Sequence, residues 1–148
     1  IKMSETNDNK YIITVTGIQE IDGEKDRIEV TVTGDYVEKN GHRYIKYKEY
    51  DAEDPSICLD TAVKVEENKV SIIRMGDHPS RLILEKDVRH QCHYNTVMGD
   101  IMMGVYTSSI ENNLTDNGGD LTAKYELDFF ADLVSKNEFH INVKAKEE

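Results

Sequence analysis

Metal-ligating side chains gather at one point of the sequence, in the segment His90-Gln91-Cys92-His93. Zinc needs three or four Cys and His ligands that converge on one point, and this segment offers three within four residues. On a β-strand, however, His90 and Cys92 would share one face while His93 points to the other. Unless a distant Cys or His approaches in space, we expect a buried free thiol flanked by polar histidines, with no metal and no cofactor.

Carboxylates are abundant, but most of them fall on the polar half of an alternation or beside a turn, where solubility explains them. A general acid and base would need two carboxyls within about 5–10 Å in a dry cleft. Glu49 is the exception, since it shares a strand face with Ile45 and Tyr47 and is expected to point inward. Ser108 and Ser109 lack the context of a nucleophile elbow. We therefore favour a non-catalytic protein.

An arginine and several tyrosines are expected to enter an apolar interior. Arg74 lies on the same strand face as Val70 and Ile72, and an unpaired buried guanidinium costs several kcal/mol. Two interpretations follow: either this group receives the acidic head of a ligand, or it forms an internal ion pair, with Glu49 as a candidate partner, inside a filled core. The candidate ligand-binding residues are Arg74, Tyr47, Glu49, Tyr94 and Tyr125.

The elements that must position these side chains are short strands. From Tyr11 onward, apolar and polar residues alternate in short runs, which are separated by turn signals such as Asp22-Gly23 and Asn40-Gly41. The pattern predicts about ten strands in an up-and-down meander. An open sheet of that size would expose two edges, so we predict a closed antiparallel barrel of eight to ten strands. The stretch Leu127 to Val134 also fits a helical stripe, but the alternation that begins at Leu121 favours a strand.

The composition limits the partners and the compartment. The chain has 148 residues and a formal net charge of −11, a field that repels nucleic-acid phosphate and anionic lipid. Basic and aromatic residues alternate from Arg43 to Lys48, but on a strand they would be divided between its two faces. The lysines are therefore expected on the outer face, opposite acidic residues such as Glu29 or Glu66 on neighbouring strands. We expect no nucleic-acid partner, no membrane and a cytoplasmic location, because the chain shows no signal peptide, no membrane-length apolar run and only two cysteines. Residues 1–10 are expected to be a flexible segment before a single domain over residues 11–148.

Several short stretches resemble the YwiB-like bacterial β-barrels, a group similar in fold to the calycins, which include the lipocalins and the fatty-acid-binding proteins. The resemblance covers nearly the whole chain and implies a cytoplasmic bacterial protein with a calycin-type interior. It brings no catalytic residue to carry over. The stretches are Gly34-Asp35-Tyr36, Tyr44-Ile45-Lys46-Tyr47, Ile72-Ile73-Arg74-Met75-Gly76, Tyr94-Asn95-Thr96 with Gly99, and Ala123-Lys124-Tyr125.

Together these observations predict an all-β, up-and-down, calycin-like barrel that binds a small amphipathic or anionic ligand in its interior without catalysis. Two alternatives stay open. The first is a protein–protein interaction module, including a homodimer, in which the barrel is filled and serves as a scaffold. The second is an enzyme of unknown reaction.

Overall fold

Ten β-strands make up the regular structure of the computed structural model, which describes residues 10–50, 54, 56–76, 79–96, 99–129 and 133–147. Within these ranges there is no helix, and hence none that could span a membrane. The strands are β1 (Tyr11–Ile21), β2 (Glu24–Lys39), β3 (His42–Tyr50), β4 (Cys58–Glu66), β5 (Lys69–Met75), β6 (Ser80–Glu85), β7 (Arg89–Thr96), β8 (Gly99–Thr115), β9 (Gly118–Phe129) and β10 (Leu133–Ala145). The predicted segment at residues 1–10 lies, except for Lys10, outside the described residues.

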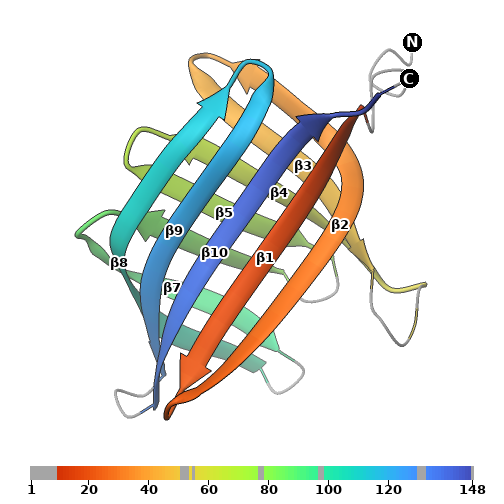
Figure 1. The fold of residues 1–148 in the computed structure, drawn as a ribbon. Helices are drawn as coiled ribbons and strands as arrows, with labels where there is room; N and C mark the ends of the chain where they lie inside the picture. Colours follow the sequence, from red (N-terminus) through yellow and green to blue (C-terminus); the bar gives the residue numbers. More distant parts are fainter. Residues whose placement is uncertain are drawn as a thin grey trace.

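Each strand pairs antiparallel with the next one in the chain, and β1 pairs with β10, so the sheet closes on itself (Figure 1). The closing ladder runs from Tyr11 opposite Ala145 to Glu20 opposite Lys136. The prediction of an all-β, antiparallel, up-and-down barrel of eight to ten strands is therefore confirmed.

The tight turns form where residues that tolerate positive φ stand between two alternating runs. In the β1–β2 turn, φ is 52° at Asp22 and 83° at Gly23, and in the β2–β3 turn it is 56° at Asn40 and 83° at Gly41. Asn, Asp and Gly adopt this left-handed conformation at least cost, which matches the twist of a two-residue hairpin.

Two strand boundaries differ from the sequence-based expectation. The stretch from Asn112 to Asp120 is predicted to be an acidic loop because of its acidic residues and its Gly118-Gly119 pair. It is mostly strand, because β8 continues to Thr115 and pairs with β9 from Gly118 onward. The predicted strand from Leu127 to Val134 is instead the junction of two strands, since β9 ends at Phe129 and Leu133 of β10 pairs back onto it. In both places cross-strand pairing decides the boundary, and this is not visible in a local pattern.

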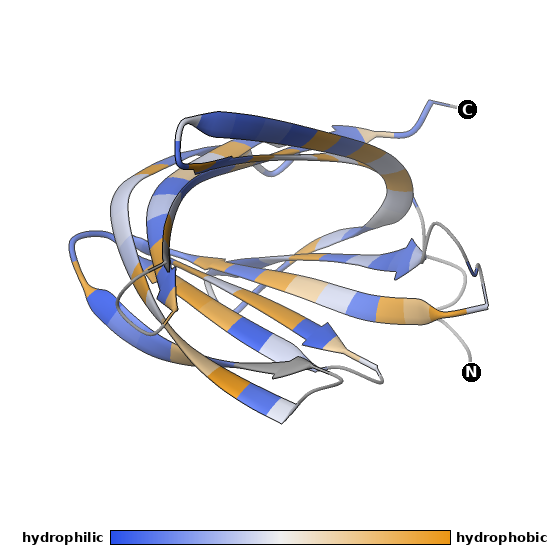
Figure 2. Ribbon diagram, turned by 90° about the horizontal axis from the view of Figure 1, so that it is seen from below, coloured by the Kyte–Doolittle hydropathy of each residue, from blue (hydrophilic) through white to orange (hydrophobic). Residues whose placement is uncertain are grey.

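The apolar core fills the half of the barrel where β1 begins and β10 ends. These two strand ends lie beside the chain termini (Figure 1). Seen from below, hydrophobic and hydrophilic segments alternate along the strands around the ring (Figure 2). Each large apolar side chain that is fully buried contributes roughly 1.5–3 kcal/mol to the stability of the fold. The fully buried core residues in this half include Ile13, Ile45, Val63, Val70, Leu84, Leu121 and Ile141.

Gly34 is the corner of the barrel, because it pairs with Tyr11 of β1 and also with Tyr47 of β3. Before it, β2 pairs with β1 alone, and after it β2 pairs with β3 alone. A Cβ atom at this position would lie 2.3 Å from the carbonyl oxygen of Lys46 and 2.6 Å from Cδ1 of Ile13. Glycine is therefore required where the three strands meet.

The same corner leaves the other half of the barrel open along one side. Residues 24–33 of β2 have a ladder partner in β1 but none on their opposite edge within the described chain. Ile28 and Val30 lie on the strand face that turns inward at Gly34, yet they are 67% and 44% exposed. The interior is therefore accessible from the side between β2 and β3.

Candidate functional site

A cavity of about 920 Å³ occupies the half of the barrel opposite the packed core. It is lined by the strand ends that lie farthest from the termini, namely the end of β1, the start of β2, the end of β3 and their counterparts around the ring. Its walls are mainly apolar and include Ile28, Leu59, Leu82, Leu127, Phe129 and Phe139. The barrel is thus packed at one end and hollow at the other.

One polar cluster stands on the wall of this cavity, and three adjacent strands supply it. Arg74 of β5 donates from Nε to Oε1 of Glu49 of β3 at 2.9 Å. Thr61 of β4, which pairs across the ladder with Arg74, donates from its hydroxyl to the same Oε1 at 2.5 Å. Both side chains of the ion pair are about one-third exposed, at 31% for Arg74 and 33% for Glu49. The pair therefore faces the cavity and is not sealed in the core.

The electrostatics of the cluster keep the arginine charged. Burial alone would lower the pKa of Arg74, but the charge and the hydrogen bond of Glu49 outweigh it, so the pKa is raised. The guanidinium is thus a permanent cation with one carboxylate as its counter-ion.

Two tyrosines lie close enough to the ion pair to interact with it electrostatically. Tyr125 lines the cavity, and burial raises its pKa while Arg74 opposes the shift. Tyr47 is 6% exposed; burial raises its pKa well above the ordinary value of a phenol, and Glu49 adds to this shift. Its hydroxyl has no hydrogen-bond partner in the described part of the chain. Both phenols are protonated at neutral pH, so each keeps an O–H group that is able to donate.

Three of the five sequence-predicted site residues lie together on the cavity wall: Arg74, Glu49 and Tyr125. Tyr47 is in the same cluster but belongs to the buried core and is not part of the wall. The side chain of Tyr94 lies outside the described residues. Of the two interpretations of Arg74, the ion pair with Glu49 is formed, but the interior beside it is hollow and not filled. Ligand binding by these residues stays a prediction.

The sequence analysis missed much of the cavity wall, including two polar residues that face each other. Gln19 of β1 and Asn137 of β10 pair across the ladder, and both line the cavity. The signal was present, because Asn137 falls in step with Phe139 and Ile141 on the apolar face of its strand. A polar residue at an inward position is a sign of a wet interior.

The segment at residues 90–93 has a different environment from a metal site. His90 Nε2 lies 2.9 Å from Oε1 of Glu85, and Cys92 is a buried free thiol. No group of three or more His, Cys, Asp or Glu side chains suited to a metal ion occurs among the residues that the structure describes. Of the lysines predicted to lie opposite acidic residues such as Glu29 or Glu66, Lys48 pairs with a different acidic residue of the neighbouring strand, Asp60, at 2.8 Å.

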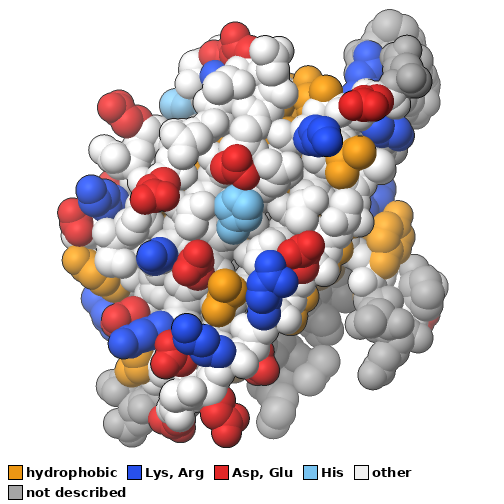
Figure 3. All heavy atoms as spheres, viewed as in Figure 1, with side chains coloured by type: hydrophobic (Ala, Val, Ile, Leu, Met, Phe, Trp, Pro, Cys, Tyr) orange, Lys and Arg blue, Asp and Glu red, His pale blue; other side chains and the backbone are white. Residues whose placement is uncertain are grey.

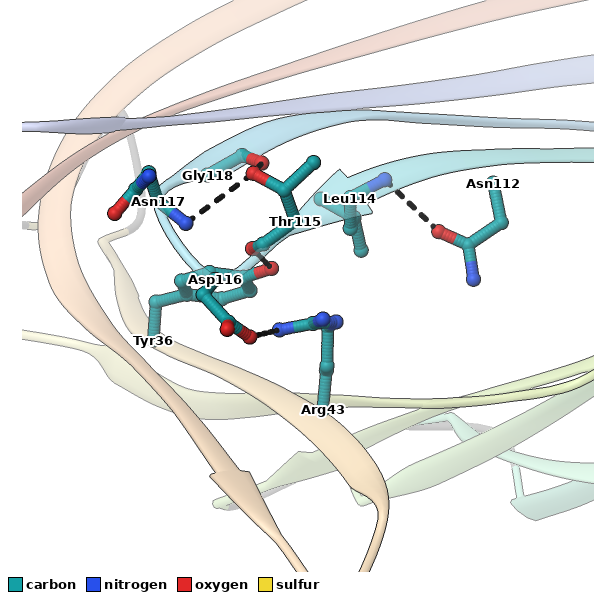
Figure 4. A network of polar contacts seen from close by, with 8 residues as sticks. All are labelled: Tyr36, Arg43, Asn112, Leu114, Thr115, Asp116, Asn117 and Gly118. Carbon is teal, nitrogen blue, oxygen red and sulfur yellow. Dashed lines mark hydrogen bonds and ion pairs between the residues drawn. The ribbon is translucent and has the colours of Figure 1, made fainter.

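A second polar network lies at the opposite end of the barrel and ties the β8–β9 turn to β2 and β3 (Figure 4). The Tyr36 hydroxyl donates to the carbonyl oxygen of Thr115 at 2.5 Å. Arg43 Nη1 lies 3.0 Å from Oδ1 of Asp116, and its guanidinium carbon lies 6.0 Å from the centre of the Tyr36 ring. The nitrogen–oxygen distance in this ion pair is similar to that between Arg74 and Glu49, but its carboxylate is more exposed and neither residue lines the cavity. It therefore offers a control for the loss of a counter-charge away from the cavity.

Comparison with known proteins places the fold in a family context. Residues 13–141 match the family model described as Domain of unknown function (DUF1934). A solved structure, the crystal structure of ywiB protein from Bacillus subtilis, superposes with a TM-score of 0.82 at 20% sequence identity. The match covers 97% of this chain and 99% of that one. Among functionally curated proteins, none matches.

Proposed function

The chain belongs to the DUF1934 family, and from the geometry of its barrel we propose that it binds a small amphipathic molecule in the interior without transforming it. The observation that carries this proposal is a cavity of about 920 Å³ whose walls combine apolar side chains with polar groups, among them the ion pair of Arg74 and Glu49. Pockets for small molecules have this character and fall in the range of roughly 300–1,000 Å³.

The apolar walls supply the driving force for binding. Leu82, Leu127 and Phe139 lie on three different strands and face the same space. Removing apolar ligand surface from water contributes roughly 25 cal/mol for each Å² that is buried. The ion pair of Arg74 and Glu49, together with the Tyr125 hydroxyl, gives the polar end of the ligand a fixed position.

The ligand reaches this space from the open side of the barrel. The rim carries apolar side chains in contact with solvent, with Ile28 at 67%, Tyr50 at 59% and Ile57 at 43% exposure, and all three line the cavity. Exposed apolar groups around an apolar hollow are typical of a site that a ligand covers.

The test is the binding of Nile red, a neutral amphipathic dye that fluoresces in apolar surroundings, to purified protein. We expect saturable binding to the wild type and its loss in Leu127→Trp, which fills the cavity. As a control, Val37→Trp adds the same ring at an exposed position outside the cavity and keeps wild-type binding. Absence of saturable binding to folded wild type, or equal binding by both tryptophan variants, contradicts the proposal.

A second candidate function is self-association through the free edge of β2. Within the described part of the chain, residues 24–33 have no ladder partner on this edge, and such an edge is a template for another strand. In an antiparallel pair of two such edges centred on Ile28, Arg27 of each copy would face Glu29 of the other. The outer face of β8, β9, β10, β1 and β2 offers no comparable surface, since charges of both signs are scattered over it (Figure 3).

Light scattering of the eluting protein across a concentration series tests this second candidate. We expect a dimer that Val30→Lys disrupts, because a charge on the inward face of an edge strand opposes pairing. Thr31→Lys places the same charge on the outer face of β2 and leaves the dimer intact. A wild type that stays monomeric throughout the series contradicts self-association.

A further inference from the structure

The ion pair of Arg74 and Glu49 leaves specific hydrogen-bonding groups unused. Both contacts to the carboxylate, from Arg74 Nε and from the hydroxyl of Thr61, go to the same oxygen, Oε1. The other oxygen, Oε2, and the two Nη groups of the guanidinium have no hydrogen-bond partner among the described residues. Because Glu49 and Arg74 both line the cavity, this acceptor and these donors belong to two paired side chains on its wall.

The net charge of the cluster argues against a charged ligand head. Glu49 already neutralises Arg74, so an incoming carboxylate gains one attraction and meets one repulsion at similar range. The other charged residues that line the cavity, Arg27, Arg81, Asp26 and Glu138, also balance in charge. The chain as a whole carries a formal charge of −11, which adds to the repulsion of an anion. A cation would in turn meet the guanidinium.

A neutral group with a donor and an acceptor on neighbouring atoms fits this arrangement. Its oxygen accepts from an Nη group of Arg74 while its N–H donates to Oε2 of Glu49, so both partners stay charged and both become satisfied. The Tyr125 hydroxyl, which lines the same cavity, is a further donor to such an oxygen. A ligand that lacks either the donor or the acceptor would leave a desolvated polar group of the protein without a partner. Such an unpaired group is a strong source of discrimination between ligands.

We propose that the molecule bound in this cavity has an uncharged head of the carboxamide or lactam type, read by the Glu49 and Arg74 pair, and an apolar body held by the walls. This inference rests on the proposed binding function and narrows it: of the amphipathic or anionic ligands expected from the sequence, it selects the neutral ones.

The experiment compares three ligands with the same body, octanamide, octanoate and methyl octanoate, as competitors of Nile red at pH 8. The amide offers a donor and an acceptor, the ester only an acceptor, and the octanoate is a full anion at this pH. We expect the amide to displace the dye at a concentration about ten-fold or more below that of the octanoate, which corresponds to about 1.4 kcal/mol, with the ester between them. Equal or tighter binding of the octanoate by the wild type, or an ester that equals the amide, overturns the inference.

A variant tests the origin of the preference. Glu49→Gln removes the counter-charge and leaves Arg74 as an unpaired cation on the wall, so the order should reverse in favour of octanoate. Asp116→Asn removes the counter-charge of Arg43 at the opposite end of the barrel and should leave the wild-type order unchanged. An amide preference that persists in folded Glu49→Gln overturns the inference; if that variant does not fold, the wild-type series with three ligands decides.

Failure of the binding proposal is separable from failure of this inference. If the wild type does not bind Nile red, the cavity does not function as proposed. If it binds the dye but all three competitors displace it equally, the cavity binds amphipathic molecules and the ion pair does not read the head group.

Discussion

The substitution of Gly34 by Ala tests why the barrel closes at one end and stays open at the other. The new methyl group would lie 2.3 Å from a backbone oxygen, that of Lys46, and 2.6 Å from the fully buried Ile13. The oxygen belongs to the backbone, and Cδ1 of Ile13, although it ends a side chain, is enclosed in the fully buried core. We therefore expect β2 to move away from β1 or from β3. Overpacking of this kind costs about 1–3 kcal/mol, and we expect the upper end, about 3 kcal/mol, because the backbone itself must shift.

The matched control is Gly17→Ala. A Cβ atom at Gly17 would have no neighbouring atom within 4 Å, and the residue lies on the cavity wall, so its substitution relieves the entropy cost of glycine, about 0.5–1 kcal/mol, without a clash. In thermal unfolding followed by circular dichroism, a loss of about 3 kcal/mol lowers the Tm of a domain of this size by roughly 6–12 °C. A Tm for Gly34→Ala within about 2 °C of that for Gly17→Ala would refute the role of Gly34 as the corner.

Four further substitutions test the packing and the electrostatics. In Gly104→Ala the new Cβ would lie 2.5 Å from Nη2 of Arg89 and 2.8 Å from Oδ1 of Asp128, the two partners of a partly exposed ion pair. Because both atoms end side chains and an exposed ion pair contributes little, we expect a cost below about 1 kcal/mol in urea unfolding. A cost like that of Gly34→Ala contradicts this reasoning. Glu49→Leu or Arg74→Leu leaves the other member of the ion pair as a partly exposed charge without its partner, so each should lower the free energy of unfolding by about 1–2 kcal/mol. In a double-mutant cycle the double variant should lose less than the sum of the two single losses. Strictly additive losses contradict the coupling of the two residues. The Tyr47→Phe change removes a buried hydroxyl that has no partner in the described chain, so stability at neutral pH should stay equal or rise by up to about 1 kcal/mol. Burial raises the pKa of Tyr47 in the folded state, so the folded protein holds this proton more tightly than the unfolded one. The free energy of unfolding of the wild type should therefore fall as pH rises above about 10. An equally steep fall with pH in Tyr47→Phe contradicts the link to Tyr47.

The fold was accessible from the sequence because its signals are local. Alternation places Ile13, Ile45 and Val63 on one face, and Asp22-Gly23 and Asn40-Gly41 fix where the strands reverse. A continuous meander of this kind needs no long-range information beyond the need to cover its edges. The ends of β8 and β9 were missed because only cross-strand pairing defines them.

The site was accessible only in part, for a geometric reason. Period two predicted that Arg74 and Glu49 share the interior, and the two residues meet at 2.9 Å. It could not predict that the interior is packed on one side of this pair and hollow on the other, since that depends on the corner at Gly34. The step at which β2 leaves β1 is set by a three-strand contact, and no pattern within one strand encodes it.

The central claim is that the hollow half of the barrel holds a small molecule. Native mass spectrometry of the protein purified from its own host, beside Leu127→Trp prepared in the same way, tests it most directly. A cavity of about 920 Å³ predicts that the wild type carries an added small-molecule mass which is released on activation in the gas phase, and that the variant carries none. If both preparations show only the mass of the protein chain without an added molecule, the claim is contradicted.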